Sequence, residues 1–162
     1  MLPKGHTYYL SGPMTGLPKF NIPAFEYATS YLRSEGYTII SPAELDSSET
    51  RGAGLASVGG QLDEEGKVGG VSYGEMLGRD VRIVIDNAQG MIFLPGWWTS
   101  KGARIEAYTA LITGKKRFAM FFSRGTYDVN IDQLHQLDTL HTMPVESVWA
   151  TLLRFAPSGG TV

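Results

Sequence analysis

The stretch from residue 78 to residue 116 constrains the fold most, because it reads as helix, strand, turn and helix in direct succession: GRDVRIVIDNAQGMIFLPGWWTSKGARIEAYTALITGKK. Each of the two predicted helices carries one acid on the flank of its apolar stripe, Asp80 in the first and Glu106 in the second. A side chain in that position faces the edge of a neighbouring sheet rather than bulk water. Two carboxyl groups directed at one cleft are what cleavage of a glycosidic bond requires.

The same alternation of strands and amphipathic helices extends over most of the chain. Since strands that alternate with helices form parallel sheets covered on both faces, we predict one α/β domain over residues 1–162, a flavodoxin-like or Rossmann-like three-layer sandwich with a parallel sheet of four to five strands. Asn21 is the expected N-cap of the first helix and Gly36 its stop. The predicted strands are 6–10, 38–40, 90–94 and 117–123, and the further helices are 73–87, 100–113 and 145–155.

Three segments do not fit this alternation. Residues 46–72 are rich in Gly, Ser and acidic residues with little apolar periodicity, which predicts a surface insertion or a mobile lid. Residues 156–162 are expected to form a frayed tail. The sequence leaves the structure of residues 124–142 open.

The bulk composition excludes several classes of protein. A chain of 162 residues with 43% hydrophobic and 11% aromatic residues can bury one substantial core. A net charge of -2 disfavours a binder of nucleic-acid polymers. The three scattered histidines and the lack of cysteine predict no metal site and no thiol chemistry. Without a recognisable targeting or membrane-spanning stretch, we expect a cytoplasmic protein that does not bind membranes.

Two loops at the carboxyl edge of the predicted sheet are candidates for ligand binding, since ligands of such sheets bind there. The first is YLSGPMTG, residues 9–16, whose backbone N–H groups could hold a phosphate or a sugar; the alternative is a plain tight turn. The second is LPGWWTSKGA, residues 94–103, with aromatic rings and a helix N-terminus; the alternative is a capping serine beside surface tryptophans. Likewise, the two acids could be solvated helix residues paired at the surface with Arg79, Arg82 and Arg104.

At these residues the chain resembles a known family. YLSGPMTG, the Asp80 of GRD, and SKGARIEAYTALITGKK are similar to the nucleoside 2-deoxyribosyltransferase superfamily, and an uncharacterised, phage-rich branch of it shows a similar LPGW turn. The resemblance covers residues 7–45 and 73–117. It implies that Glu106 is the nucleophile that attacks the anomeric carbon, and that Asp80 assists protonation of the departing base. A departure from the family pattern is Ile105, where a Tyr or Phe usually precedes the nucleophile.

Ser100 distinguishes two branches of that superfamily. Nucleoside transferases typically carry an acid six residues before the nucleophile, whereas the related 2′-deoxynucleoside 5′-phosphate N-hydrolases carry a serine. An acid about 4 Å from a phosphate charge would cost on the order of 4 kcal/mol at an effective dielectric of 20. A hydroxyl, with Lys101 and the helix N-terminus beside it, avoids this cost and favours a monophosphate substrate.

The predicted activity is cleavage of the N-glycosidic bond of a (deoxy)nucleoside 5′-monophosphate through a covalent glycosyl-glutamate, without metal or organic cofactor. The phosphate cradle is expected from Gly12, Met14, Thr15 and Ser100, and stacking on the base from Tyr9, Phe20 or Trp97. Pro13, Asn21, Pro95, Gly96 and Gly102 complete the predicted substrate-binding residues.

Two alternatives stay open. One is base exchange between nucleosides by a deoxyribosyltransferase, and the other is a non-catalytic, phage-type protein that sequesters a nucleotide. In each case the expected partner is a small nucleoside or nucleotide, and the family resemblance implies a homodimer or a larger homo-oligomer.

Overall fold

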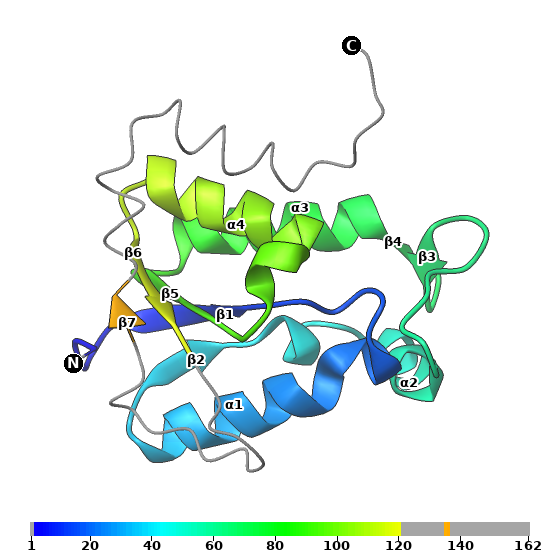
Figure 1. Cartoon of the computed structure of the whole chain (residues 1–162), viewed down its shortest axis with the longest axis horizontal. Coiled ribbons are helices and arrows are strands. Elements are labelled where there is room, and N and C mark those ends of the chain that lie inside the picture. Colours follow the sequence, from blue (N-terminus) through cyan, green and yellow to red (C-terminus); the bar gives the residue numbers. More distant parts are fainter. Residues whose placement is uncertain (1, 121–134, 137–162) are drawn as a thin grey trace.

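A parallel sheet with helices on both faces forms the framework of the protein (Figure 1). The computed structural model describes residues 2–120 and 135–136. Within that range the sheet order is β2-β1-β5-β6-β7, in which the first four strands are parallel and β7 is antiparallel to β6. The strands are β1 (Thr7–Ser11), β2 (Thr38–Ile40), β5 (Gly90–Phe93), β6 (Lys116–Ala119) and β7 (His135–Gln136). The predicted three-layer α/β fold is therefore confirmed.

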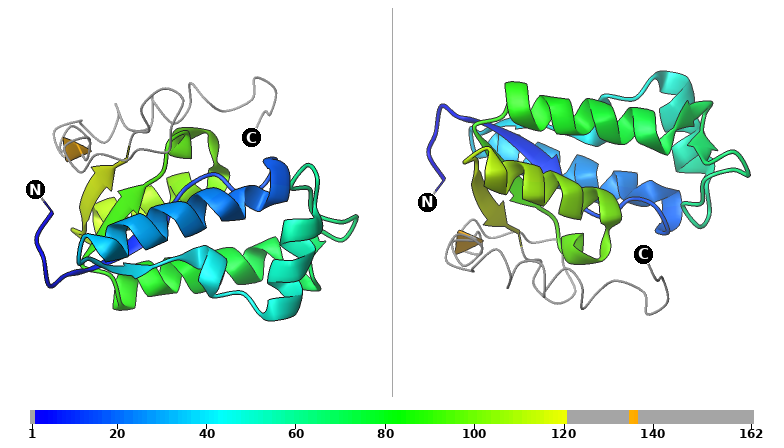
Figure 2. Two further views of the ribbon diagram at one scale, coloured as in Figure 1. Left: turned by 90° about the horizontal axis from the view of Figure 1, so that it is seen from below. Right: turned by 90° about the horizontal axis from the view of Figure 1, so that it is seen from above.

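The helices divide between the two faces of the sheet. Helices α3 (Tyr73–Asp86) and α4 (Lys101–Ile112) lie side by side on one face, and α1 (Ile22–Ser34) covers the other (Figure 2). Short 3-10 turns, η1 (Pro18–Asn21), η2 (Pro42–Glu44) and η3 (Trp97–Thr99), follow the carboxyl ends of β1, β2 and β5. In the described part of the chain, no helix is long and apolar enough to cross a membrane.

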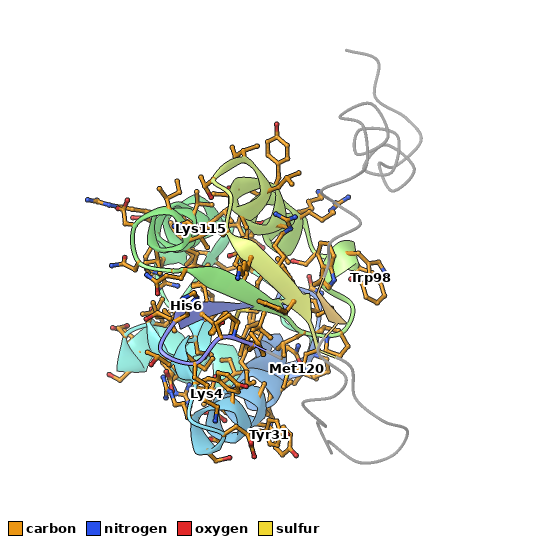
Figure 3. The ribbon with its side chains drawn as sticks, turned by 90° about the vertical axis from the view of Figure 1, so that its left-hand side faces the viewer. Lys4, His6, Tyr31, Trp98, Lys115 and Met120 are labelled. Atoms are coloured by element: carbon orange, nitrogen blue, oxygen red, sulfur yellow. The ribbon has the colours of Figure 1, made fainter. Side chains whose placement is uncertain are left out.

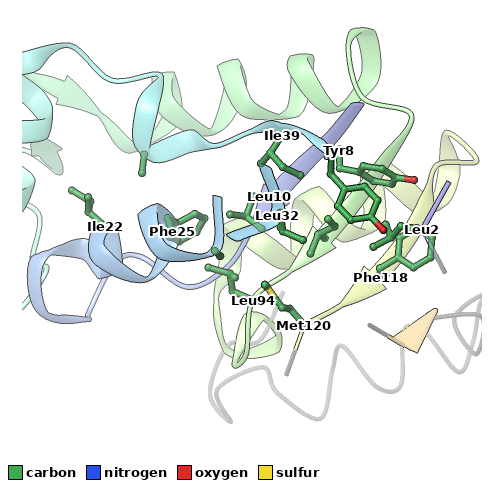
Figure 4. Packing of buried hydrophobic residues seen from close by; sticks show 14 of the residues in the cluster. Leu2, Tyr8, Leu10, Ile22, Phe25, Leu32, Ile39, Leu94, Phe118 and Met120 are labelled. Atoms are coloured by element: carbon green, nitrogen blue, oxygen red, sulfur yellow. The ribbon is translucent and has the colours of Figure 1, made fainter. Parts of the chain in front are cut away.

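The side chains of β1 point alternately to the two faces of the sheet and so contribute to the core on both sides. Tyr8 and Leu10 point to the α1 side, where they join a buried cluster with Phe25 and Leu32 (Figure 4). Tyr9 points to the other side, into the cluster formed with α3 and α4. Because side chains of a strand alternate between its two faces, the residue after Leu10 must also face α3 and α4. That residue is Ser11, at the carboxyl end of the strand and almost completely buried.

The order of the strands defines the place where a ligand is expected. The chain passes from β1 to β2 on one side and then returns to β5 on the other side of β1. The carboxyl ends of β1 and β5 thus flank the point at which the direction of winding reverses, and such switch points leave a crevice. Ser11 and Phe93 are paired across this point.

The 46–72 segment contains more regular structure than its composition indicates. It folds into helix α2 (Ser48–Ala56) and a small hairpin of β3 (Lys67–Val68) and β4 (Val71–Ser72). Its backbone is tied to the loop after β1, since Gly16 N donates to Gly60 O and Lys19 N donates to Ser57 O, both at 2.8 Å. Whether the segment moves as a lid stays a prediction. The predicted helix 145–155, the tail 156–162 and residues 121–123 of the predicted fourth strand lie outside the described residues.

Gly60 is the tightest contact between this segment and the loop. Its φ is +63°, and a Cβ there would lie 2.0 Å from the Leu17 carbonyl oxygen. A left-handed conformation alone costs a non-glycine residue about 1–2 kcal/mol, and the overlap adds to this. We expect Gly60→Ala to lower the free energy of unfolding by at least about 2 kcal/mol, measured by urea denaturation.

Gly59→Ala is the matched control, because a Cβ at Gly59 would make only ordinary contacts with the Gln61 side chain. Its effect should stay within about 0.5 kcal/mol. Equal stability of the two variants would show that the segment does not depend on this contact.

Candidate functional site

A pocket of about 460 Å³ opens at the carboxyl edge of the sheet, beside the switch point. Its walls come from the loop after β1, the 46–72 segment, and the N-terminal halves of α3 and α4. The size is that of pockets that bind small organic ligands. Both predicted catalytic acids, Asp80 and Glu106, line this one pocket.

Glu106 lies at the inner end of the pocket, with only 7% of its surface exposed. The Ser11 hydroxyl donates a hydrogen bond to its Oε2, and the Tyr9 hydroxyl lies 3.4 Å from its Oε1. Burial raises the pKa of Glu106 to about 7, although the Ser11 hydrogen bond acts in the opposite direction. The carboxyl group can therefore exist in either protonation state near neutral pH.

Asp80 is similarly buried, with 8% of its surface exposed. The Arg79 Nε donates to its Oδ1 at 2.8 Å. Burial raises the pKa of Asp80, while Arg79 and a hydrogen bond from Tyr9 partly offset this effect. The net result is a carboxyl group that holds a proton more readily than an exposed aspartate.

The Tyr9 hydroxyl links the two acids, because it interacts with Glu106 and with Asp80. Burial and the two neighbouring carboxyl groups raise the pKa of Tyr9 well above its ordinary value, so the hydroxyl stays protonated and can donate. Its ring is completely buried. This leaves no open ring face for the predicted stacking on a base, and the contribution of Tyr9 comes from its hydroxyl.

The residues predicted to hold a phosphate line the pocket. Ser100 is the N-cap of α4, where its hydroxyl accepts from Ala103 N at 3.3 Å. Lys101 and Gly102 follow it in the first turn, and a Cβ at Gly102 would lie 3.1 Å from the Tyr73 hydroxyl. The remaining predicted residues with pocket contacts are Gly12, Met14, Thr15 and Phe20.

The other predicted substrate-binding residues have structural contacts and do not line the pocket. Trp97 packs its ring on Phe93 at a centroid distance of 4.7 Å, while its neighbour Trp98 lies exposed at the edge of the molecule (Figure 3). The Asn21 amide donates to the Pro13 carbonyl at 2.9 Å and thereby closes the loop after β1. Asn21 lies at the N-cap of α1 as predicted, although without a capping hydrogen bond from its side chain. Pro95 and Gly96 form the turn before η3, with Gly96 at a φ of +79°.

Several residues that line the pocket were not among those predicted from the sequence. Tyr73 occupies the first position of α3, and Asp46 and Thr50 come from the 46–72 segment. Arg79, interpreted as a possible surface partner, is half-buried and contacts both Asp80 and Asp46. The position of Arg79 directly before Asp80 is the sequence feature that could have indicated its contact with this acid. Arg82 does pair at the surface, with Asp86 at 3.5 Å.

Comparison with known proteins gives one partial match. Residues 6–59 match a family described as "Domain of unknown function (DUF4406)". This match covers about a third of the chain and includes neither Asp80 nor Glu106. The search of curated proteins returned no match, and the search of solved structures returned none. The matched part contributes the loop after β1 and helix α2 to the pocket.

The buried state of Glu106 predicts a pH-dependent stability difference. The folded pKa, about 7, lies above the ordinary value of 4.5, so the folded state holds this proton more tightly and stability is lost as the pH rises from about 4.5 to 7. Glu106→Gln keeps an acceptor for Ser11 without the charge. We expect it to be more stable than the wild type at pH 8, on the order of 3 kcal/mol.

The difference should shrink towards zero at about pH 3, well below the ordinary pKa of 4.5, where Glu106 is protonated in both states. Urea titrations of both proteins at the two pH values measure it. A constant difference across the range would contradict the buried, titrating carboxyl group.

Proposed function

We propose that this protein hydrolyses the N-glycosidic bond of a (deoxy)nucleoside 5′-monophosphate. The observation that supports the proposal most is the pair of buried carboxyl groups, Glu106 and Asp80, in contact with one hydroxyl inside a ligand-sized pocket. Retaining glycosidases use two carboxyl groups about 5–5.5 Å apart. A single hydroxyl that interacts with both is compatible with such a separation.

In the first step the ionised Glu106 attacks the anomeric carbon and forms an ester with the sugar. The carbon–nitrogen bond breaks, its electron pair leaves with the base, and the base takes a proton from Asp80. In the second step a water molecule attacks the same carbon. The sugar–Glu106 bond breaks, and the proton of the water passes to the Asp80 carboxylate. The products are the free base and the sugar phosphate.

The surroundings of Glu106 suit a nucleophile that must lie in one orientation. The Ser11 hydroxyl donates to one carboxylate oxygen, and the Tyr9 hydroxyl lies 3.4 Å from the other, so that both contacts favour one plane of the group. The raised pKa also makes the carboxylate more basic than an exposed one. Because only the ionised Glu106 can attack, activity should increase as the pH rises towards 7.

The first turn of α4 supports a phosphorylated substrate. The backbone N–H groups of that turn and the Ser100 hydroxyl are donors at the positive end of the helix dipole, and Lys101 adds a charge at the rim. An anion bound there would lie on the same helix as Glu106, somewhat more than one turn before it. A 5′-phosphate next to the reacting sugar fits this arrangement.

Replacing Glu106 tests the reaction directly. We expect Glu106→Gln to reduce the release of free base from nucleoside monophosphates by at least about 1,000-fold, because it removes the nucleophile. Chromatography of a panel of nucleosides and monophosphates measures the release. Glu35→Gln, which changes an exposed acid at the end of α1, should leave the rate unaltered.

The outcomes separate the three functions. Base exchange on unphosphorylated nucleosides would indicate a transferase. Thermal stabilisation by nucleotides without any free base would indicate a binding protein. Unchanged base release by Glu106→Gln would exclude the proposed mechanism.

The proposed phosphate contact at Ser100 has its own test. Aspartate is an equally good N-cap, so Ser100→Asp should fold while it sets a negative charge against the phosphate. We expect the KM for the monophosphate to rise about 100-fold or more, and the KM for the matching nucleoside to stay nearly constant. Ser100→Asn, a neutral N-cap, is the control for size. Equal changes for both substrates in Ser100→Asp would argue against a phosphate at this position.

A further inference from the structure

Arg79 connects the proposed acid to the segment that covers the pocket. Its Nε donates to Asp80 Oδ1 at 2.8 Å, and its NH1 donates to Asp46 Oδ1 at 2.7 Å. Both acids are mostly buried, and the guanidinium is about one-third exposed. One cation is therefore shared between two carboxyl groups in partly desolvated surroundings, where charge interactions are stronger than at the surface.

Asp46 belongs to the part of the chain that forms the outer wall. It follows η2 and stands directly before Ser47, the N-cap whose side chain accepts from Thr50 N at the start of α2. Helix α2 in turn is joined to α1 by the ion pair between Arg51 and Glu26. Asp46 thus joins η2 to the 46–72 segment, whereas Asp80 lies within α3.

We propose that Asp46 is a positioning residue that draws part of the Arg79 charge away from Asp80, so that Asp80 carries a proton when the 46–72 segment covers the pocket. The inference rests on the proposed function of Asp80 as the acid. It adds that the outer wall of the pocket controls this acid. With Asp46 displaced, Arg79 would pair with Asp80 alone and favour its carboxylate, the form unable to protonate a departing base.

The charged groups around Asp80 support this direction. Arg79 from α3 favours its carboxylate, while Asp46 disfavours it. Glu106 from α4 interacts with Asp80 by charge, and the neutral Tyr9 hydroxyl from β1 lies between the two acids as a donor that they share. Lys101, also from α4, lines the same pocket. Among these groups, Asp46 is the one supplied by the 46–72 segment, and it contacts Asp80 through Arg79.

The test is the titration of the Asp80 carboxyl carbon, followed by NMR in the full-length protein. Asp46→Asn should lower the pKa of Asp80, because it removes a repulsive charge and leaves Arg79 to Asp80. Arg79→Gln should raise it, because it removes the favourable cation. Opposite shifts are expected only if the three groups share charge as proposed, since general loosening of the structure would move both variants in the same direction.

Glu44→Gln is the matched control. Glu44 is an acid two residues before Asp46 that pairs with Arg33 at 2.7 Å, away from the pocket. This variant should leave the titration of Asp80 unchanged. If Arg79→Gln fails to fold, Asp46→Asn decides alone: a lower pKa supports the coupling, and an unchanged or raised pKa overturns it.

The rate of base release is the second readout. In Asp46→Asn the alkaline limb of the pH profile should move to lower pH. At pH values above that limb, the rate should fall about tenfold for each unit by which the pKa of Asp80 is lowered. The NMR titration does not depend on turnover. If the wild type releases no base, the proposed function fails, while the titration still supports or overturns the coupling between Asp46 and Asp80.

Discussion

The burial of two carboxyl groups around the Tyr9 hydroxyl is the constraint on which the site depends. Ionised carboxylates are costly to bury, and two of them in one pocket repel each other. The surrounding contacts divide the two acids into different environments. Both acids interact with the Tyr9 hydroxyl, but Ser11 provides a neutral donor to Glu106, whereas Asp80 has a cation in direct contact. Acids in unlike environments can serve as nucleophile and proton donor in the same reaction.

The parallel sheet is what brings these groups together. Tyr9 and Ser11 alternate with the core residues Tyr8 and Leu10 along β1, so they face α3 and α4 at the switch point. Helices α3 and α4 lie side by side on that face, and each contributes one acid. The function proposed here therefore depends on the register of a single strand. A shift by one residue would turn both hydroxyl groups to the opposite face.

The sequence predicted the framework and the two acids because both produce periodic signals. The apolar spacing around Asp80 and Glu106 placed each acid on the inner flank of its helix, and both are buried in the pocket. The outer wall gave no such signal. Helix α2 has the composition SETRGAGLA with few apolar residues, and its hairpin strands contain two residues each. The contacts that hold this wall join residues far apart in the chain, such as Gly60 with Leu17 and Asp46 with Arg79.

Trp97 shows that a clear sequence signal can also mislead. Its position after a strand predicts contact with a ligand, but its ring packs on Phe93 of the preceding strand.

The turn before α1 has a consequence for ligand binding. Lys19, Phe20 and Asn21 all have positive φ values, 54°, 49° and 56°, a conformation that asparagine tolerates but that costs Lys19 and Phe20 about 1–2 kcal/mol each. Hydrogen bonds from Lys19 N to Ser57 O and from the Asn21 amide to Pro13 O hold the turn in this state. Phe20 is thereby set in the pocket wall before any ligand arrives. This wall loses its conformational entropy during folding. A ligand therefore binds a preorganised surface, and association does not carry the cost of ordering it.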